Sequence, residues 1–218
     1  MNSKFKEYIR LHFKMVPWYV YIIAACGGIA VSVLGGKSGF TVMEMLIFLI
    51  LVFVFPYFDK ICSVTIYQKE AYFYMSFPVN AFQVVFSKTL VTAALIVMVP
   101  AGYVFTSMVV AGDYEAGLIV SVILLIIAMG FLIAGIVVTG YRVGNNFRNQ
   151  KREMPNKLVA YIYIVVILFA IYMMAKVVLK IDTISDTGKI LVITGISAVI
   201  GVLSLIMNSQ AVKKYYEA

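Results

Sequence analysis

Cysteine, histidine and tryptophan are scarce in this 218-residue chain, which has two cysteines, one histidine and one tryptophan. The two cysteines, Cys26 and Cys62, provide no disulfide framework, and the single His12 provides no histidine cluster for a metal ion. Charged residues make up only 13% of the sequence, and no polar stretch is long enough to fold as a separate soluble domain. These shortages argue against a metal site and against a soluble catalytic domain.

Catalytic motifs are missing as well. The sequence contains no His-Glu-x-x-His motif, no Gly-x-Ser-x-Gly nucleophile turn and no Gly-x-x-x-x-Gly-Lys-Ser/Thr phosphate loop. The centres of its apolar runs are almost uncharged, whereas ion-coupled carriers usually keep an acidic residue at that depth. We therefore expect no catalytic residue, no metal and no cofactor in this chain, so the energy for any transport would come from another protein.

Apolar residues are what the chain has in excess. They make up 63% of the sequence, against roughly 45–50% in a soluble domain. They form continuous rather than alternating runs, which indicates helices, and a helix of about 20 residues crosses the hydrocarbon core of a membrane. We predict one all-α transmembrane domain, residues 1–218, with about six spans at residues 16–34, 40–58, 84–110, 118–140, 158–179 and 190–207.

Lysine and arginine are distributed unequally between the two predicted sides of these runs. Fourteen fall on one side and three on the other (Lys37, Lys180 and Lys189), while Lys176 lies near the end of the fifth run. Because cytoplasmic loops collect basic residues, both termini should lie in the cytoplasm of a multi-pass protein of the bacterial inner membrane. The same rule explains the net charge of +8, and we expect no nucleic-acid partner.

The segment before the first run, residues 1–15, is predicted to be an amphipathic helix lying in the cytoplasmic interface. At 100° per residue its apolar and charged side chains fall on opposite faces. The apolar face comprises Phe5, Tyr8, Ile9, His12, Phe13 and Val16, and the charged face comprises Lys4, Lys6, Glu7, Arg10 and Lys14. On this interpretation His12 is an interfacial side chain and not a catalyst.

Small residues recur inside the runs. Gly130-x-x-x-Ala134 and Ser197-x-x-x-Gly201 have the spacing that lets helices approach closely, and packing within one chain explains them as well as dimerisation does. Pro100 removes a backbone hydrogen bond inside the third run and should kink that helix. None of these features identifies a function.

Residues 59–88 between the second and third runs are the most informative segment. Residues 61–74 are predicted to form a helix beside the cytoplasm, and Pro78 should end it because proline cannot continue a hydrogen-bonded helix. There follows the phrase Ser76-Phe77-Pro78-Val79-Asn80, then Gln83-Val84-Val85, then Ser87-Lys88.

This phrase resembles one found at the same place in the type 2 ABC exporter permease family. There Leu-Pro-Val-Ser is followed by a basic or polar residue, an apolar pair, and Ser-Lys or Gly-Lys. Here Phe77 replaces the leucine, Asn80 replaces the serine, and Ala81-Phe82 replaces the usual basic residue. About a dozen residues match the motif, while the predicted topology and the amphipathic first helix match over the whole chain.

The resemblance implies a permease subunit that works with a cytoplasmic ABC ATPase subunit, which would bind ATP and Mg, and with a second permease copy, identical or related. It places a coupling helix in the loop of residues 59–83, with a weaker contact in a second cytoplasmic loop, residues 141–157. The residues to which it gives the coupling role are Tyr67, Gln68, Lys69, Glu70, Ala71, Tyr72, Ser76, Pro78 and Asn80. The alternative is an interfacial loop with aromatic anchors.

A substrate path through these spans would be lined by aromatic, methionine and hydroxyl side chains. The main candidates are Tyr57, Tyr103, Thr106, Tyr161, Tyr172 and Met173, with Thr65, Ser107, Tyr163 and Met174 beside them. Such a lining favours cargo that is amphipathic or resembles a membrane lipid. Small permeases of the family that the sequence resembles often export peptides, which favours a peptide. The alternatives are that these residues only pack, and that the chain is the substrate-capture subunit of a vitamin uptake system, a lipid flippase or a structural membrane protein.

Overall fold

The computed structural model describes residues 3–34, 80–111, 116–146, 157–180 and 185–217, together with Met45, Leu49, Val52 and Tyr57. All elements in these ranges are helices: α1 (Ser3–Met15), α2 (Trp18–Leu34), α5 (Ala81–Ala111), α6 (Ala116–Asn146), α7 (Lys157–Leu179) and α8 (Asp186–Glu217). The described ranges contain no strand, so the predicted all-helical class is confirmed for them.

Four of these helices are long and apolar enough to cross a membrane, namely α5, α6, α7 and α8. A fifth candidate arises when α1 and α2, which are bent by 63° relative to each other, are counted together. The chain therefore has the helices of a membrane protein. The predicted second run, residues 40–58, lies outside the described ranges apart from four single residues, and the sixth span stays a prediction.

Most of the helices extend beyond the apolar runs that predicted them, although α2 begins two residues later than its run. α6 continues through residues 141–146, so the loop predicted at residues 141–157 begins later than expected, and α5 takes in residues 81–83 of the loop predicted at residues 59–83. α8 covers residues 186–217 instead of 190–207. The reason is physical: hydropathy marks where a helix is apolar, whereas backbone hydrogen bonding continues into polar residues at the membrane surface.

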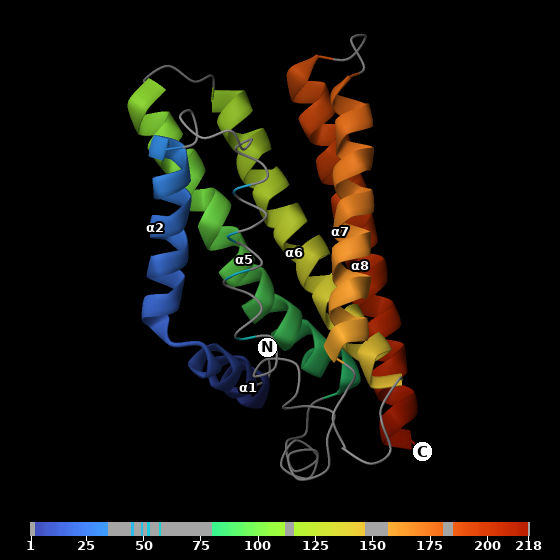
Figure 1. Cartoon of the computed structure of the whole chain (residues 1–218). Coiled ribbons are helices and arrows are strands. Elements are labelled where there is room, and N and C mark those ends of the chain that lie inside the picture. Colours follow the sequence, from blue (N-terminus) through green and yellow to red (C-terminus); the bar gives the residue numbers. More distant parts are fainter. Residues whose placement is uncertain are drawn as a thin grey trace.

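In Figure 1 the helices α2, α5, α6, α7 and α8 run roughly along one long axis, and α1 lies crosswise below α2, against the lower part of α5. Helices α5 and α7 start, and α6 and α8 end, toward the lower end of the view, while α2 ends toward the upper end. The core is formed mainly by α2, α5 and α6. Its most buried members include Val20, Ala24, Val91, Leu95, Val99, Leu132 and Ile136.

Helices α2 and α5 are in contact through their backbones. A Cβ atom on Gly28 would overlap the carbonyl oxygen of Val99, and one on Gly102 would overlap the carbonyl oxygen of Ala25. Helices in a membrane associate through close packing of this kind, because lipid tails are as apolar as the side chains and the hydrophobic effect does not drive the helices together. Pro100 lies inside this contact region, and α5 continues past it as one helix.

Helices α6 and α8 also pack closely, as the small residues predicted. Gly201 of α8 lies against Leu132, and a Cβ on Gly135 would come within 2.7 Å of the Oγ of Ser204. The other predicted small residue, Gly130, faces Val97 of α5. Small side chains therefore bring α6 close to two neighbours at once.

Candidate functional site

The start of α5 is fixed by a reciprocal pair of hydrogen bonds. The Gln83 backbone N–H donates to Oδ1 of Asn80 at 2.9 Å, and the Asn80 N–H donates to Oε1 of Gln83 at 3.1 Å. This is a capping box, which satisfies backbone donors that have no partner in the first turn of a helix. Asn80, from the family-like phrase, therefore has a defined local role: it makes α5 begin at Ala81.

The other residues given the coupling role lie outside the described ranges. They are Tyr67, Gln68, Lys69, Glu70, Ala71, Tyr72, Ser76 and Pro78. Their assignment stays a prediction, as does that of Thr65 on the substrate path.

The end of the same phrase lies in the protein interior. Ser87 is fully buried and Lys88 is 3% exposed, although sequence analysis counted Lys88 among the basic residues of a cytoplasmic loop. The Ser87 hydroxyl donates to the Val84 carbonyl at 2.9 Å, and the Thr89 hydroxyl donates to the Val85 carbonyl at 2.9 Å. The base of α5 thus carries a run of buried polar groups.

Helix α1 packs on this base, and His12 is at the contact. Its Nδ1 donates to the Tyr8 carbonyl at 3.0 Å, and the two rings lie 4.5 Å apart. Both residues are fully buried, so the prediction that His12 is an interfacial side chain needs correcting. The apolar face of α1 contacts protein rather than only lipid, because the α1–α2 bend lays α1 against α5; Phe5 meets Phe86 there with a ring distance of 6.4 Å.

This environment keeps the His12 imidazole neutral. Burial, with a smaller contribution from the positive charge of Lys88, lowers the pKa of His12 from 6.5 to about 4, although the hydrogen bond to Tyr8 acts in the opposite direction. The imidazole is therefore uncharged at neutral pH. The charged residues of α1 that the structure describes face outward, as predicted: Lys6, Glu7, Arg10 and Lys14.

Two of the predicted path residues, Tyr103 and Thr106, are half-buried on α5. A third, Tyr57, packs against the core. The Thr106 hydroxyl donates to the Gly102 carbonyl at 3.0 Å. This bond within the helix already satisfies that hydroxyl, as is common for threonine in apolar helices.

The other three lie on α7, where Tyr161 and Tyr172 share one face of the helix. Tyr161 packs against the core, Met173 is 47% exposed, and the Tyr172 ring lies 4.7 Å from the Lys176 Nζ above its face. None of the six lines the cavity that α6, α7 and α8 enclose, whereas Met174 does. Their role as a path stays a prediction.

A polar cluster between α6 and α8 was missed by sequence reasoning. Asn208 is 2% exposed, and its Nδ2 donates to the Thr139 hydroxyl at 2.9 Å. Ser204 lies 3.1 Å from the same hydroxyl. Hydropathy ended the last span at residue 207, one position before Asn208; the available signal was the four-residue spacing of Ser204 and Asn208, which places both on one helical face.

The described residues contain no group of three or more side chains that could hold a metal ion. Comparisons with protein-family models, with curated proteins and with solved structures each found no match.

Proposed function

We propose that this chain is the membrane-spanning permease subunit of an ATP-driven ABC exporter that uses a separate ATPase subunit. The observation that carries the proposal is the phrase of residues 76–88 and its place in the fold. Asn80 caps α5, and Lys88 is buried at the base of α5, where α1 packs. A push on the segment before Asn80 would therefore reach α1 and α5 as rigid bodies.

The six-span, both-ends-inside topology is part of this proposal. α2 ends at the upper end of the bundle and α5 begins at the lower end (Figure 1). The apolar run at residues 40–58, which falls mostly outside the described residues, is the crossing that we propose between them. Basic residues favour the lower end as the cytoplasmic one, since Lys6, Arg10 and Lys14 of α1 and Lys213 of α8 lie there.

For cargo we propose a hydrophobic or amphipathic molecule, most simply a peptide. The described parts of the predicted spans offer apolar, aromatic and hydroxyl side chains, and a small charged solute would be desolvated there without a compensating partner. Identical or related permeases would pair, and each would rest on one ATPase subunit.

The proposal is tested by co-expressing the chain with the ATPase encoded beside it. We expect a complex with two copies of each subunit, ATP hydrolysis only when the ATPase is present, and stimulation by amphipathic helical peptides but not by sugars or ions. Tyr67→Ala with Tyr72→Ala, or Glu70→Lys, should leave the protein in the membrane but weaken ATPase binding. Lys180→Glu, at the opposite end, is the matched control and should change nothing.

Two results would contradict the proposal. One is a stable permease that binds no ATPase in pull-downs. The other is stimulation of the complex by small hydrophilic solutes with no response to peptides, which would favour a different cargo. Full coupling in the Tyr67, Glu70 and Tyr72 triple variant would move the ATPase contact to another loop.

A further inference from the structure

Helices α6, α7 and α8 enclose a cavity of about 250 Å³. Its lining is aliphatic except for one methionine and one serine: Leu132, Ile171, Met174, Val177, Val178, Ile193, Ile196, Ser197 and Ile200. The Ser197 hydroxyl already donates to the Met129 Sδ at 3.1 Å. No lining side chain therefore offers a charge, and the cavity suits hydrocarbon rather than water or a polar ligand.

The size and shape of the cavity fit a chain-like ligand. A cavity of ~150 Å³ lined by aliphatic side chains stays dry and holds a benzene-sized molecule, and this one is larger. The lining residues of α7 run from 171 to 178 and those of α8 from 193 to 200. At 1.5 Å per residue each set extends roughly 10 Å along its helix, so the cavity is long in the direction of the helices.

The cavity opens sideways between α7 and α8. Leu132 of α6 is 1% exposed and forms its floor, whereas Met174 is 55% and Val177 is 65% exposed. In a membrane these exposed side chains face lipid tails, so a tail can enter without leaving the hydrocarbon layer. This opening distinguishes the cavity from an internal packing defect.

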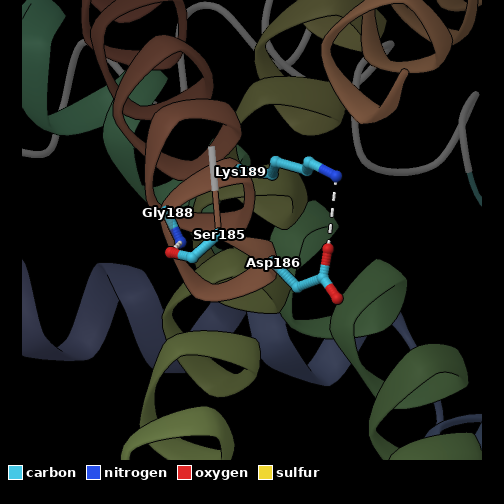
Figure 2. Close-up of polar contacts among 4 residues, drawn as sticks. All are labelled: Ser185, Asp186, Gly188 and Lys189. Carbon is cyan, nitrogen blue, oxygen red and sulfur yellow. Dashed lines mark hydrogen bonds and ion pairs between the residues drawn. The ribbon is translucent and has the colours of Figure 1, made fainter. Parts of the chain in front are cut away.

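A basic residue lies just beyond the upper end of the cavity. Lys189 precedes Ile193 by one helical turn on the same face of α8, and its side chain is only 12% exposed. Its Nζ lies 3.3 Å from Asp186, which is 91% exposed, and Ser185 caps this first turn by accepting from the Gly188 N–H at 3.2 Å (Figure 2). The charged and capped turn marks the depth at which α8 leaves the apolar layer.

We propose that this cavity is a binding site for one acyl chain of a membrane phospholipid, with the lipid phosphate at the level of Lys189. The acyl chain lies along Ile171, Ile193 and Ile196, and the phosphate is attracted to the ammonium group of Lys189, which lies at headgroup depth. The site lies in the half of the bilayer away from α1. It does not depend on the proposed function.

The experiment purifies the full chain in mild detergent, adds dioleoylphosphatidylglycerol, and counts retained lipid by native mass spectrometry. We expect one lipid per chain. Ile193→Trp fills the cavity and should weaken retention by about tenfold or more, because several methylene groups lose their burial. The control is Val199→Trp, which adds the same side chain on α8 at a 60% exposed position outside the lining, and it should retain lipid normally.

Further arms identify which part of the lipid is recognised. Lys189→Gln should weaken retention of phosphatidylglycerol but not of dioleoylglycerol, which has the same chains without phosphate, while Lys180→Gln serves as the charge control. Inorganic phosphate alone should not compete. Equal retention in the Ile193 and Val199 variants overturns the proposal, as does a lipid-free dimer whose interface Ile193→Trp disrupts, since a second copy would then cover the cavity.

Discussion

The α2–α5 contact and the α7–α8 pair are built in opposite ways. Of the apolar, potentially membrane-spanning stretch of α5, 61% is buried inside the protein, against 6% of the corresponding stretch of α7 and 11% of that of α8. Yet α5 is the less hydrophobic: its mean hydropathy is 2.0, and that of α7 and α8 is 2.6. Hydropathy alone does not decide which helices contact protein, because α6 is the most apolar of the four, with a mean hydropathy of 3.0, and 44% of its apolar stretch is buried. Between α5 and the α7–α8 pair, the close approach at small residues marks the side that contacts protein.

The largest expected difference between the two regions is in the effect of adding one methyl group to a glycine. Gly28→Ala would place Cβ on the Val99 carbonyl oxygen, so α2 and α5 must separate, at a cost of about 3 kcal/mol or more. Gly195→Ala on α8 meets nothing within 4 Å and should stabilise the helix by up to about 1 kcal/mol. Denaturant unfolding in detergent, followed by the single Trp18, measures both. Similar costs at the two sites would contradict the comparison.

A second test acts on α1, which packs on the base of α5. Since the folded pKa of His12 is about 4 and its ordinary value is 6.5, the unfolded chain binds a proton that the folded chain excludes between these values. The contribution of His12 is therefore complete above pH 6.5 and falls as the pH drops toward 4, by about 1.4 kcal/mol per pH unit.

The unfolding free energy of His12→Gln should lack this part of the pH dependence. Subtracting it from the unfolding free energy of the original protein at each pH removes the contribution of the carboxylates, because both proteins have the same carboxylates. As the only histidine of the chain, His12 also gives one unambiguous NMR titration. A midpoint near 6.5 would mean that α1 does not bury this residue against α5.

The third test measures how firmly α8 is attached to α6. Asn208→Leu removes the bond to the Thr139 hydroxyl, and Thr139→Val removes the other partner. Polar pairs between membrane helices contribute about 0.6 kcal/mol on average, and at most roughly 2. A double-mutant cycle on unfolding free energy should give a coupling in this range; a coupling of zero would mean that the Asn208–Thr139 bond does not help to hold α8 on α6.

The effect expected at the cap of α5 is comparable in size to this coupling. Asn80→Ala removes the acceptor for the Gln83 N–H and should cost about 1 kcal/mol, while Asn80→Asp should restore most of it. Hydrogen exchange of the first turn of α5 is the direct measurement. If Asn80→Ala instead changes ATPase binding without changing exchange, its role is contact rather than capping.

Sequence reasoning predicted the helices well and their partners poorly. It gave the amphipathic α1, the apolar centres of α2, α5, α6, α7 and α8, and the small residues at which helices approach. It did not find that Lys88 is buried, that His12 is fully covered by protein, or that Asn208 bonds to α6. Each of these depends on which residues of other helices lie next to the side chain, and hydropathy gives no information about contacts between helices.

The predicted site residues show the same difference between local features, which the sequence predicts, and contacts between helices, which it does not. Asn80 was placed at the end of the loop, and its capping role follows from a three-residue spacing, which is local. The six residues proposed for the substrate path came from their chemistry alone, and the structure distributes them over α5, α7 and the Tyr57 region instead of around the cavity of α6, α7 and α8. The chemical type of a side chain does not show whether that side chain lines a path, so these residues could not be selected from the sequence.

The sequence by itself determined that the described chain is helical, that several of its helices are apolar enough to cross a membrane, and where the apolar centres of those helices lie. These properties follow from the requirement that every backbone polar group be bonded in lipid and from the length of each apolar run. Only the tertiary structure decided that Gly28 and Gly102 join α2 to α5, that α1 folds back onto α5, and that α7 and α8 enclose an apolar cavity with α6. Those outcomes depend on contacts between residues far apart in the chain, and in an almost uniformly apolar sequence many pairings look equally favourable until shape selects among them.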